Sequence, residues 1–218
     1  MRIIDIEQRT PDWHIWRNLG VSASDASVIL GLSTELDLAD DEDTIALLHD
    51  SVSPYKTPWR LWAEKTGLVV PEDLSRNPHV QRGLALEGAA IADFEERHAT
   101  LLLPLCGESE ACREIRASFD GVDPDGTPVE IKVPCSRRYL EVLSLGTSSD
   151  LYRLYWPQVQ TQLYVAGADK GWLVFYQGPG VHHEFVVTRD DQFIDGQLVP
   201  AMRAFWTKVQ SNEAPAMD

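Results

Sequence analysis

The stretch 118–134, SFDGVDPDGTPVEIKVP, could bring three charged side chains together on a β-hairpin. In VEIKV, strict alternation places Glu130 and Lys132 on one face of a strand and the apolar residues on the other. An odd-numbered loop centred near Asp125 would set Asp120 across from Glu130 on that face. An even-numbered loop would put the two acids on opposite faces.

Two acids and an amine held this close suggest metal-assisted hydrolysis. Carboxylates at Asp120 and Glu130 would repel each other and therefore need a compensating cation. Carboxylate and carbonyl oxygens are ligands that suit Mg²⁺, with Mn²⁺ as a substitute. The competing interpretation is a solvated polar face of a sheet, which is the commoner meaning of such alternation.

A further carboxylate, Glu87, falls in the middle of an apolar stripe on a predicted long helix. An unpaired carboxylate buried on such a stripe would cost several kcal/mol, about the penalty of an uncompensated charge. Glu87 could therefore be paired with an arginine or lie at the edge of the stripe. Beside Asp120 and Glu130, a third acid directed at the same metal is favoured. The stripe consists of Val80, Leu84, Ile91 and Phe94.

The elements that must position these residues can be predicted from periodicity and caps. Helices are expected to start near 22–33 and to occupy 57–67, 77–99, 157–167 and 190–211; strands are expected within 100–105, 113–121, 128–135, 171–177 and 184–188. This order predicts an α/β fold with a mixed central β-sheet flanked by helices.

Composition predicts one globular domain over residues 1–218, with an acidic insertion at about 33–54. This insertion is either a solvated, partly mobile segment or a lid or partner-binding segment. A formal charge of -15 argues against loose attraction to nucleic acid, although carboxylates inside a site can still hold a metal. Three cysteines fall short of a four-cysteine zinc or iron–sulfur site. We expect reduced thiols, no membrane span, no signal peptide and a cytoplasmic location.

Four blocks in order make the sequence resemble the YqaJ-type viral recombination nucleases, the family of phage lambda exonuclease. The blocks are WHIWRNLGVSASDAS, RGLALEGAAIADFEE, SFDGV with EIKVP, and PQVQTQLYVAG. The resemblance spans most of the chain. It implies a restriction-endonuclease-like core with an Asp, Glu-x-Lys metal site.

The resemblance also implies roles for the charged residues. Asp120, Glu130 and the backbone carbonyl of Ile131 would ligate Mg²⁺. Lys132 would orient the attacking water and offset charge on the scissile phosphate. Glu87 would support a second ion or a water bound to it.

Other residues would hold the DNA. Arg17, Ser22 and Ser24 form a plausible pocket for a 5′-phosphate, although either serine could simply cap a helix. Glutamines of the QVQ helix would position the site or nearby DNA, or would be exposed helix residues; a pair of arginines after the metal strand could contact the DNA backbone. These four residues are Gln158, Gln160, Arg137 and Arg138.

The expected function is a Mg²⁺-dependent 5′→3′ exonuclease that acts on linear double-stranded DNA with a 5′-phosphate and leaves 3′ single strands for recombination. The resemblance further implies a homotrimeric ring around DNA and a single-strand annealing protein as partner. Two alternatives stay open. One is a structure-specific endonuclease or junction resolvase on the same fold, and the other is a non-catalytic acidic DNA mimic.

Overall fold

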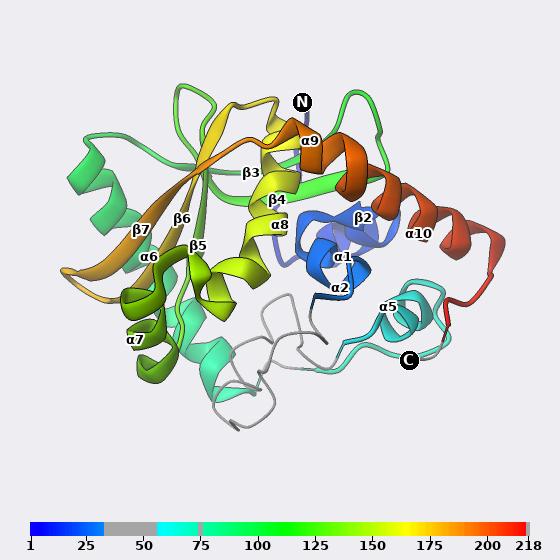
Figure 1. Ribbon diagram of the computed structural model, residues 1–218, viewed down its shortest axis with the longest axis horizontal. Helices are drawn as coiled ribbons and strands as arrows, with labels where there is room; N and C mark the ends of the chain where they lie inside the picture. Colours follow the sequence, from blue (N-terminus) through cyan, green and yellow to red (C-terminus); the bar gives the residue numbers. More distant parts are fainter. Residues whose placement is uncertain (33–55, 74–75, 217–218) are drawn as a thin grey trace.

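A computed structural model describes residues 1–32, 56–73 and 76–216 (Figure 1). The described strands form one mixed sheet in the order β1-β3-β4-β5-β6-β7, with β2 paired to β4. This confirms the predicted fold class. The strands are β1 (Arg2–Ile4), β2 (Val21–Ser22), β3 (Leu103–Glu108), β4 (Ile115–Val122), β5 (Pro128–Lys132), β6 (Lys170–Gly178) and β7 (Val181–Thr188).

The β4–β5 hairpin has the odd-numbered loop that the sequence allowed. Gly121 pairs with Val129 and Val122 pairs with Pro128, so the loop runs from Asp123 to Thr127 and is centred on Asp125. The Asp123 side chain accepts hydrogen bonds from two loop N–H groups, and Gly126 supplies the positive φ of +83°. Continuing this register sets Asp120 across from Glu130.

The pairing of β4 with β3 is irregular next to Asp120. Leu103 pairs with Val122, but Leu105 pairs with Phe119, so three residue steps of β4 oppose two steps of β3. This is a β-bulge, a feature that bends a strand and re-aims a side chain beside a site. Simple alternation along the sequence does not reveal it.

Helix α6 (Pro78–His98) covers one face of the sheet. Ala90 and Phe94 pack there against Ile131 and Val174. The predicted stripe was wrong at Leu84, which is 42% exposed, because the first turns of α6 lie beyond this contact with the sheet. Arg82 fixes those turns by donating to the Pro134 carbonyl oxygen at 3.0 Å.

Helix α8 (Asp150–Ala166) packs on the opposite face of the sheet, where Leu154 and Leu163 join the core with Leu173 and Phe175. The predicted start at Pro157 was wrong. The helix begins seven residues earlier in the chain, at Asp150, where the Ser149 side chain caps it by accepting from the N–H of Tyr152.

The remaining helices surround this core. They are α1 (Pro11–Asn18), the 3₁₀ turn η1 (Ala23–Asp25), α2 (Ala26–Ile29), α5 (Pro58–Lys65), α7 (Ser136–Leu145), η3 (Gly146–Ser148), α9 (Asp191–Phe193), a π-helical turn (Ile194–Leu198) and α10 (Val199–Ser211). Sequence reasoning predicted neither α1, α7 nor β1. The predicted closing helix is real but is divided by the π-helical turn.

The predicted acidic insertion at 33–54 lies outside the described residues. In the part of the chain that the structure does describe, no helix is long and apolar enough to span a membrane.

Candidate functional site

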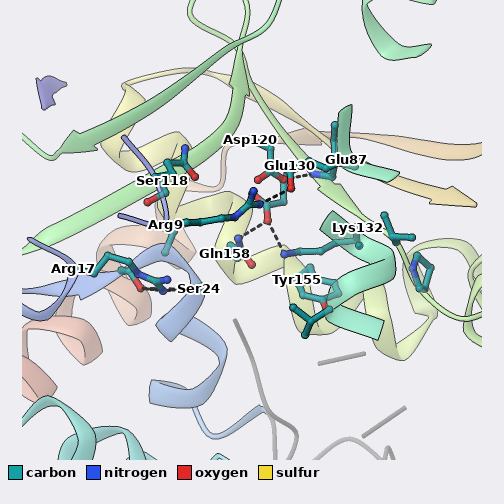
Figure 2. Close-up of a pocket in the computed structure, with 18 of the residues that line it drawn as sticks. Arg9, Arg17, Ser24, Glu87, Ser118, Asp120, Glu130, Lys132, Tyr155 and Gln158 are labelled. Carbon is teal, nitrogen blue, oxygen red and sulfur yellow. Dashed lines mark hydrogen bonds and ion pairs between the residues drawn. The ribbon is translucent and has the colours of Figure 1, made fainter. Parts of the chain in front are cut away.

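A pocket with a volume of about 110 Å³ opens where the end of β5 meets α6, α8 and the residues around α1 (Figure 2). Its lining includes most of the predicted site residues. These are Arg17, Ser22, Ser24, Glu87, Asp120, Glu130, Ile131, Lys132 and Gln158. Residues from six separate segments of the chain therefore line one space.

Two acids lie deep in this pocket: Glu130 is buried and Asp120 is half-buried. The N–H of Ile131 donates to Asp120 Oδ2 at 2.7 Å, which ties the carboxylate of β4 to the backbone of β5. Burial raises the pKa of Asp120 well above its ordinary value, and the negative charge of Glu130 raises it further, while Lys132 acts in the opposite direction. The pair is a place where a cation would relieve electrostatic strain.

Glu130 is held by three donors. Gln158 Nε2 lies 2.6 Å from Glu130 Oε1, and Gln162 Nε2 lies 2.5 Å from Glu130 Oε2. Lys132 Nζ lies 2.7 Å from Glu130 Oε1, and its ammonium also stands 4.6 Å from the centre of the Tyr155 ring. The position of this carboxylate is thus fixed from both β5 and α8.

Gln162 contacts the site, and sequence reasoning missed it. The predicted role of Gln160 in positioning the site was wrong. Gln160 Nε2 donates to the Thr188 carbonyl oxygen and its Oε1 accepts from the N–H of Asp190, away from the pocket. Residues four apart share a helix face and residues two apart do not. Gln158 and Gln162 therefore reach Glu130 together, and that spacing was the signal available in the sequence.

Glu87 reaches the pocket from α6, but it is not gathered with the other two acids into one cluster. Arg9 Nη2 forms an ion pair with Glu87 Oε2, and Figure 2 shows Arg9 extending across the pocket toward it. The Glu87 side chain is 27% exposed. This matches the alternative of an arginine-paired acid at the edge of the stripe. Its negative charge still contributes to the raised pKa of Asp120.

The predicted phosphate pocket lies beside the acids, around the start of η1. Arg17 Nη2 donates to Ser22 Oγ at 3.1 Å and to Ser24 Oγ at 2.6 Å. The guanidinium of Arg17 stacks 4.5 Å from the Trp13 ring centre. Among the described residues no carboxylate lies within ion-pair distance of Arg17, and Arg17 lines the pocket.

A buried ion pair supports this segment from behind. Lys65 Nζ of α5 lies 3.0 Å from Asp25 Oδ2 and donates to the Gly20 carbonyl oxygen at 2.9 Å. Asp25 also accepts from the N–H of Ser22. Burial alone would raise the pKa of Asp25, but Lys65 and Arg17 outweigh it and hold the pKa well below its ordinary value.

The two arginines after β5 separate in space because α7 starts at Ser136 and turns them to different sides. Arg138 is buried and donates to Glu141 at 2.6 Å, so the structure assigns it to holding α7 rather than to contacting DNA. Arg137 is exposed at the start of α7. Neither arginine lines the pocket.

Solved structures share this fold. An alkaline exonuclease from Laribacter hongkongensis superposes with a TM-score of 0.69 at 20% identity, covering 94% of both chains. The same enzyme in complex with dAMP gives 0.70 at 19% identity, again over 94% of both chains. A phage-related exonuclease from Haemophilus somnus gives 0.57 at 16% identity, covering 89% of this chain and 96% of that one. These likenesses show the restriction-endonuclease-like fold.

Sequence comparison gives the family. The chain is 28% identical over 217 residues to the uncharacterized protein YqaJ of Bacillus subtilis, covering 97% of this chain and 60% of that protein. The chain therefore spans less than two thirds of that relative's length. The model of the YqaJ-like viral recombinase domain matches residues 42–169, more than half of the sequence. With that match, the chain belongs to the YqaJ-like viral recombinase family.

Proposed function

We propose that this chain is a Mg²⁺-dependent 5′→3′ exonuclease that degrades one strand of linear double-stranded DNA. The observation that carries the proposal is a single pocket with an arginine–serine group on one side and two acids with a lysine on the other. The first group is suited to a terminal phosphate and the second to cleavage of a phosphodiester bond. The exonuclease names of the structural neighbours, one of them bound to dAMP, agree with this chemistry.

The residues present fit a divalent metal. Glu130 is buried, Asp120 is half-buried, and the two repel each other. Mg²⁺ is commonly bound through one or two carboxylates while it keeps several waters. The described residues contain no cluster of three or more His, Cys, Asp or Glu that could hold a metal. The two carboxylates with the Ile131 carbonyl oxygen are therefore the proposed set.

Buried polar atoms support the same fit. The Gln158 amide oxygen is buried and has no hydrogen-bond partner among the described residues. It lies on a side chain that lines the pocket. Waters that Mg²⁺ keeps are donors of the kind this oxygen lacks.

Each side chain then has a role in the cleavage. A divalent ion bound here would act as a Lewis acid on the phosphoryl oxygens and lower the pKa of a water. Lys132 presents a positive charge where negative charge develops on the phosphate, and Glu130 with Tyr155 fixes its ammonium. Gln158 and Gln162 hold Glu130 in one orientation. Arg17, Ser22 and Ser24 bind the 5′-phosphate and so select strand ends.

Activity in the cell forms a further part of the proposal. We propose that the exonuclease leaves 3′ single strands for recombination with a single-strand annealing protein, in the cytoplasm of a bacterial host. A homotrimeric ring enclosing the duplex would explain how a chain with a net charge of -15 stays on DNA, because enclosure replaces bulk attraction. Size-exclusion chromatography with light scattering, with and without duplex, tests the trimer.

Digestion of defined substrates tests the activity. Linear duplexes carrying a 5′-phosphate or a 5′-hydroxyl are compared with a covalently closed circle, in Mg²⁺ and in chelator. The proposal expects Mg²⁺-dependent loss of the phosphorylated linear duplex from its 5′ end and an intact circle. Cutting of the circle would instead indicate an endonuclease, and no cleavage of any substrate would favour a non-catalytic DNA mimic.

A further inference from the structure

Two glycines inside α6 are not explained by packing. A Cβ built on Gly83 or on Gly88 meets no heavy atom within 4 Å. Glycine in the middle of a helix is less favourable than alanine because it loses more conformational freedom on folding. Alanine would therefore fit both positions and stabilise the helix, so packing within the protein requires glycine at neither position.

The two glycines differ in what lies above them. Gly83 lines the pocket, and so does Glu87, one helical turn further along α6. Gly88 is exposed and lies outside the pocket lining. The open space over Gly83 therefore belongs to the pocket, whereas the space over Gly88 is solvent.

Hydrogen bonds fix α6 beside the end of β5. The helix therefore cannot readily withdraw from a strand in the pocket to make room for a side chain at position 83. The neighbouring Arg82 donates to the Pro134 carbonyl oxygen at 3.0 Å and to Gln177 Oε1 at 3.2 Å. Gln177 in turn donates to the same Pro134 carbonyl oxygen. Pro134 follows β5 and also lines the pocket. These bonds set the width between α6 and the end of β5.

We propose that Gly83 is the point at which α6 approaches the DNA strand most closely, so that the deoxyribose–phosphate backbone passes over its bare Cα. The inference rests on the proposed function and assigns α6 at Gly83 to one side of the DNA-binding pocket. A strand with its terminal phosphate at Arg17 and a phosphodiester bond at Asp120 and Glu130 must lie within this pocket. A helix surface without a side chain leaves room for the sugar, as glycine does where backbone approaches a ligand.

The experiment uses two matched pairs of variants, Gly83→Ala with Gly88→Ala and Gly83→Leu with Gly88→Leu. Alanine and leucine are both strong helix formers, so all four variants should melt at or above the temperature of the parent protein. Binding is measured by fluorescence anisotropy with a 5′-phosphorylated duplex labelled at a 3′ end, in Ca²⁺ with Mg²⁺ omitted. Digestion of the unlabelled duplex in Mg²⁺ gives kcat/KM.

Gly83→Leu is expected to weaken binding about tenfold or more and to lower kcat/KM about 10²-fold, the effect of a small misplacement of a substrate. Gly83→Ala should show a smaller loss in the same direction despite its higher melting temperature, and both Gly88 variants should match the parent protein. Equal binding by the Gly83 and Gly88 variants, with a parent protein that digests DNA, would overturn the role of Gly83 alone. A parent protein that neither binds nor digests the duplex would overturn the proposed function and this inference with it.

Discussion

Asp120 of β4 lies opposite Glu130 on the neighbouring strand β5, and the N–H of Ile131 donates to the Asp120 carboxylate at 2.7 Å. Asp120 is thus tied to the backbone of β5. Glu130 is held by Gln158 and Gln162 of α8. Neither can swing away from the other to reduce their repulsion. This forced proximity makes the pair costly without a cation and suited to holding one.

Replacement of Asp120 by asparagine is expected to stabilise the protein in chelator and to remove activity. A carboxyl group whose pKa is raised on folding destabilises the native state as the pH rises through that pKa, and Asp120→Asn lacks this loss. The expected gain near neutral pH is on the order of 1 kcal/mol or more, because each unit by which a pKa is raised corresponds to about 1.4 kcal/mol. Urea denaturation in chelator and thermal melting with Mn²⁺ measure it.

The exposed Asp169 provides the matched control for that change. Asp169→Asn should leave the free energy of unfolding, the Mn²⁺-induced rise in melting temperature and the nuclease activity unchanged. If Asp120→Asn keeps the full Mn²⁺-induced rise, the metal does not bind at Asp120.

Gln162 and Gln160 offer a test of which glutamine serves the site. Gln162→Met leaves Glu130 Oε2 without its amide donor, so activity should fall at least about tenfold and stability by about 1–3 kcal/mol. Gln160→Met loses bonds to Thr188 and Asp190 and should lose stability only. Steady-state kcat/KM at a temperature where both variants are folded separates the two, and equal kinetic losses would contradict the assignment.

Arg17 should govern the preference for phosphorylated ends. Arg17→Gln removes the guanidinium that bonds Ser22 and Ser24, so kcat/KM on a 5′-phosphorylated duplex should fall about 10²-fold, as for loss of a charge-assisted contact of roughly 3 kcal/mol. The 5′-hydroxyl duplex should be affected far less. Arg203→Gln, a change of equal charge on the exposed surface of α10, is the control and should affect neither substrate. A uniform loss on both substrates would contradict a phosphate-specific role.

Removing one partner of the buried Asp25–Lys65 pair should lower the free energy of unfolding more than removing both partners. Lys65→Met leaves the Asp25 charge buried without its nearest partner and should cost about 3–5 kcal/mol. The double variant Asp25→Asn with Lys65→Met removes both charges and should recover part of that loss. Urea denaturation of Lys65→Met, Asp25→Asn and the double variant completes the cycle. Strictly additive losses would show that the two residues are not coupled.

Local sequence patterns were enough to predict the elements that have a clear capping residue or a clear alternation of apolar and polar residues. Thr57 accepts from the N–H of Arg60 at the start of α5, as its place before Pro58 predicts. The hairpin loop around Asp125 was limited to two registers, and the structure has the odd one. By contrast, α8 starts well before Pro157 because Ser149 caps it, and proline is tolerated within that helix.

The sequence by itself determined the chemistry: which carboxylates, lysine, arginine and hydroxyls exist, and which of them alternate onto one strand face or share one helix turn. Only the tertiary structure decided their partners. Arg9 contacts Glu87, which lies 78 residues away in the sequence, and Gln162 contacts Glu130, which lies 32 residues away. The physical reason is that periodicity reports the face on which a side chain lies, whereas a partner across the fold depends on how sheet and helices pack.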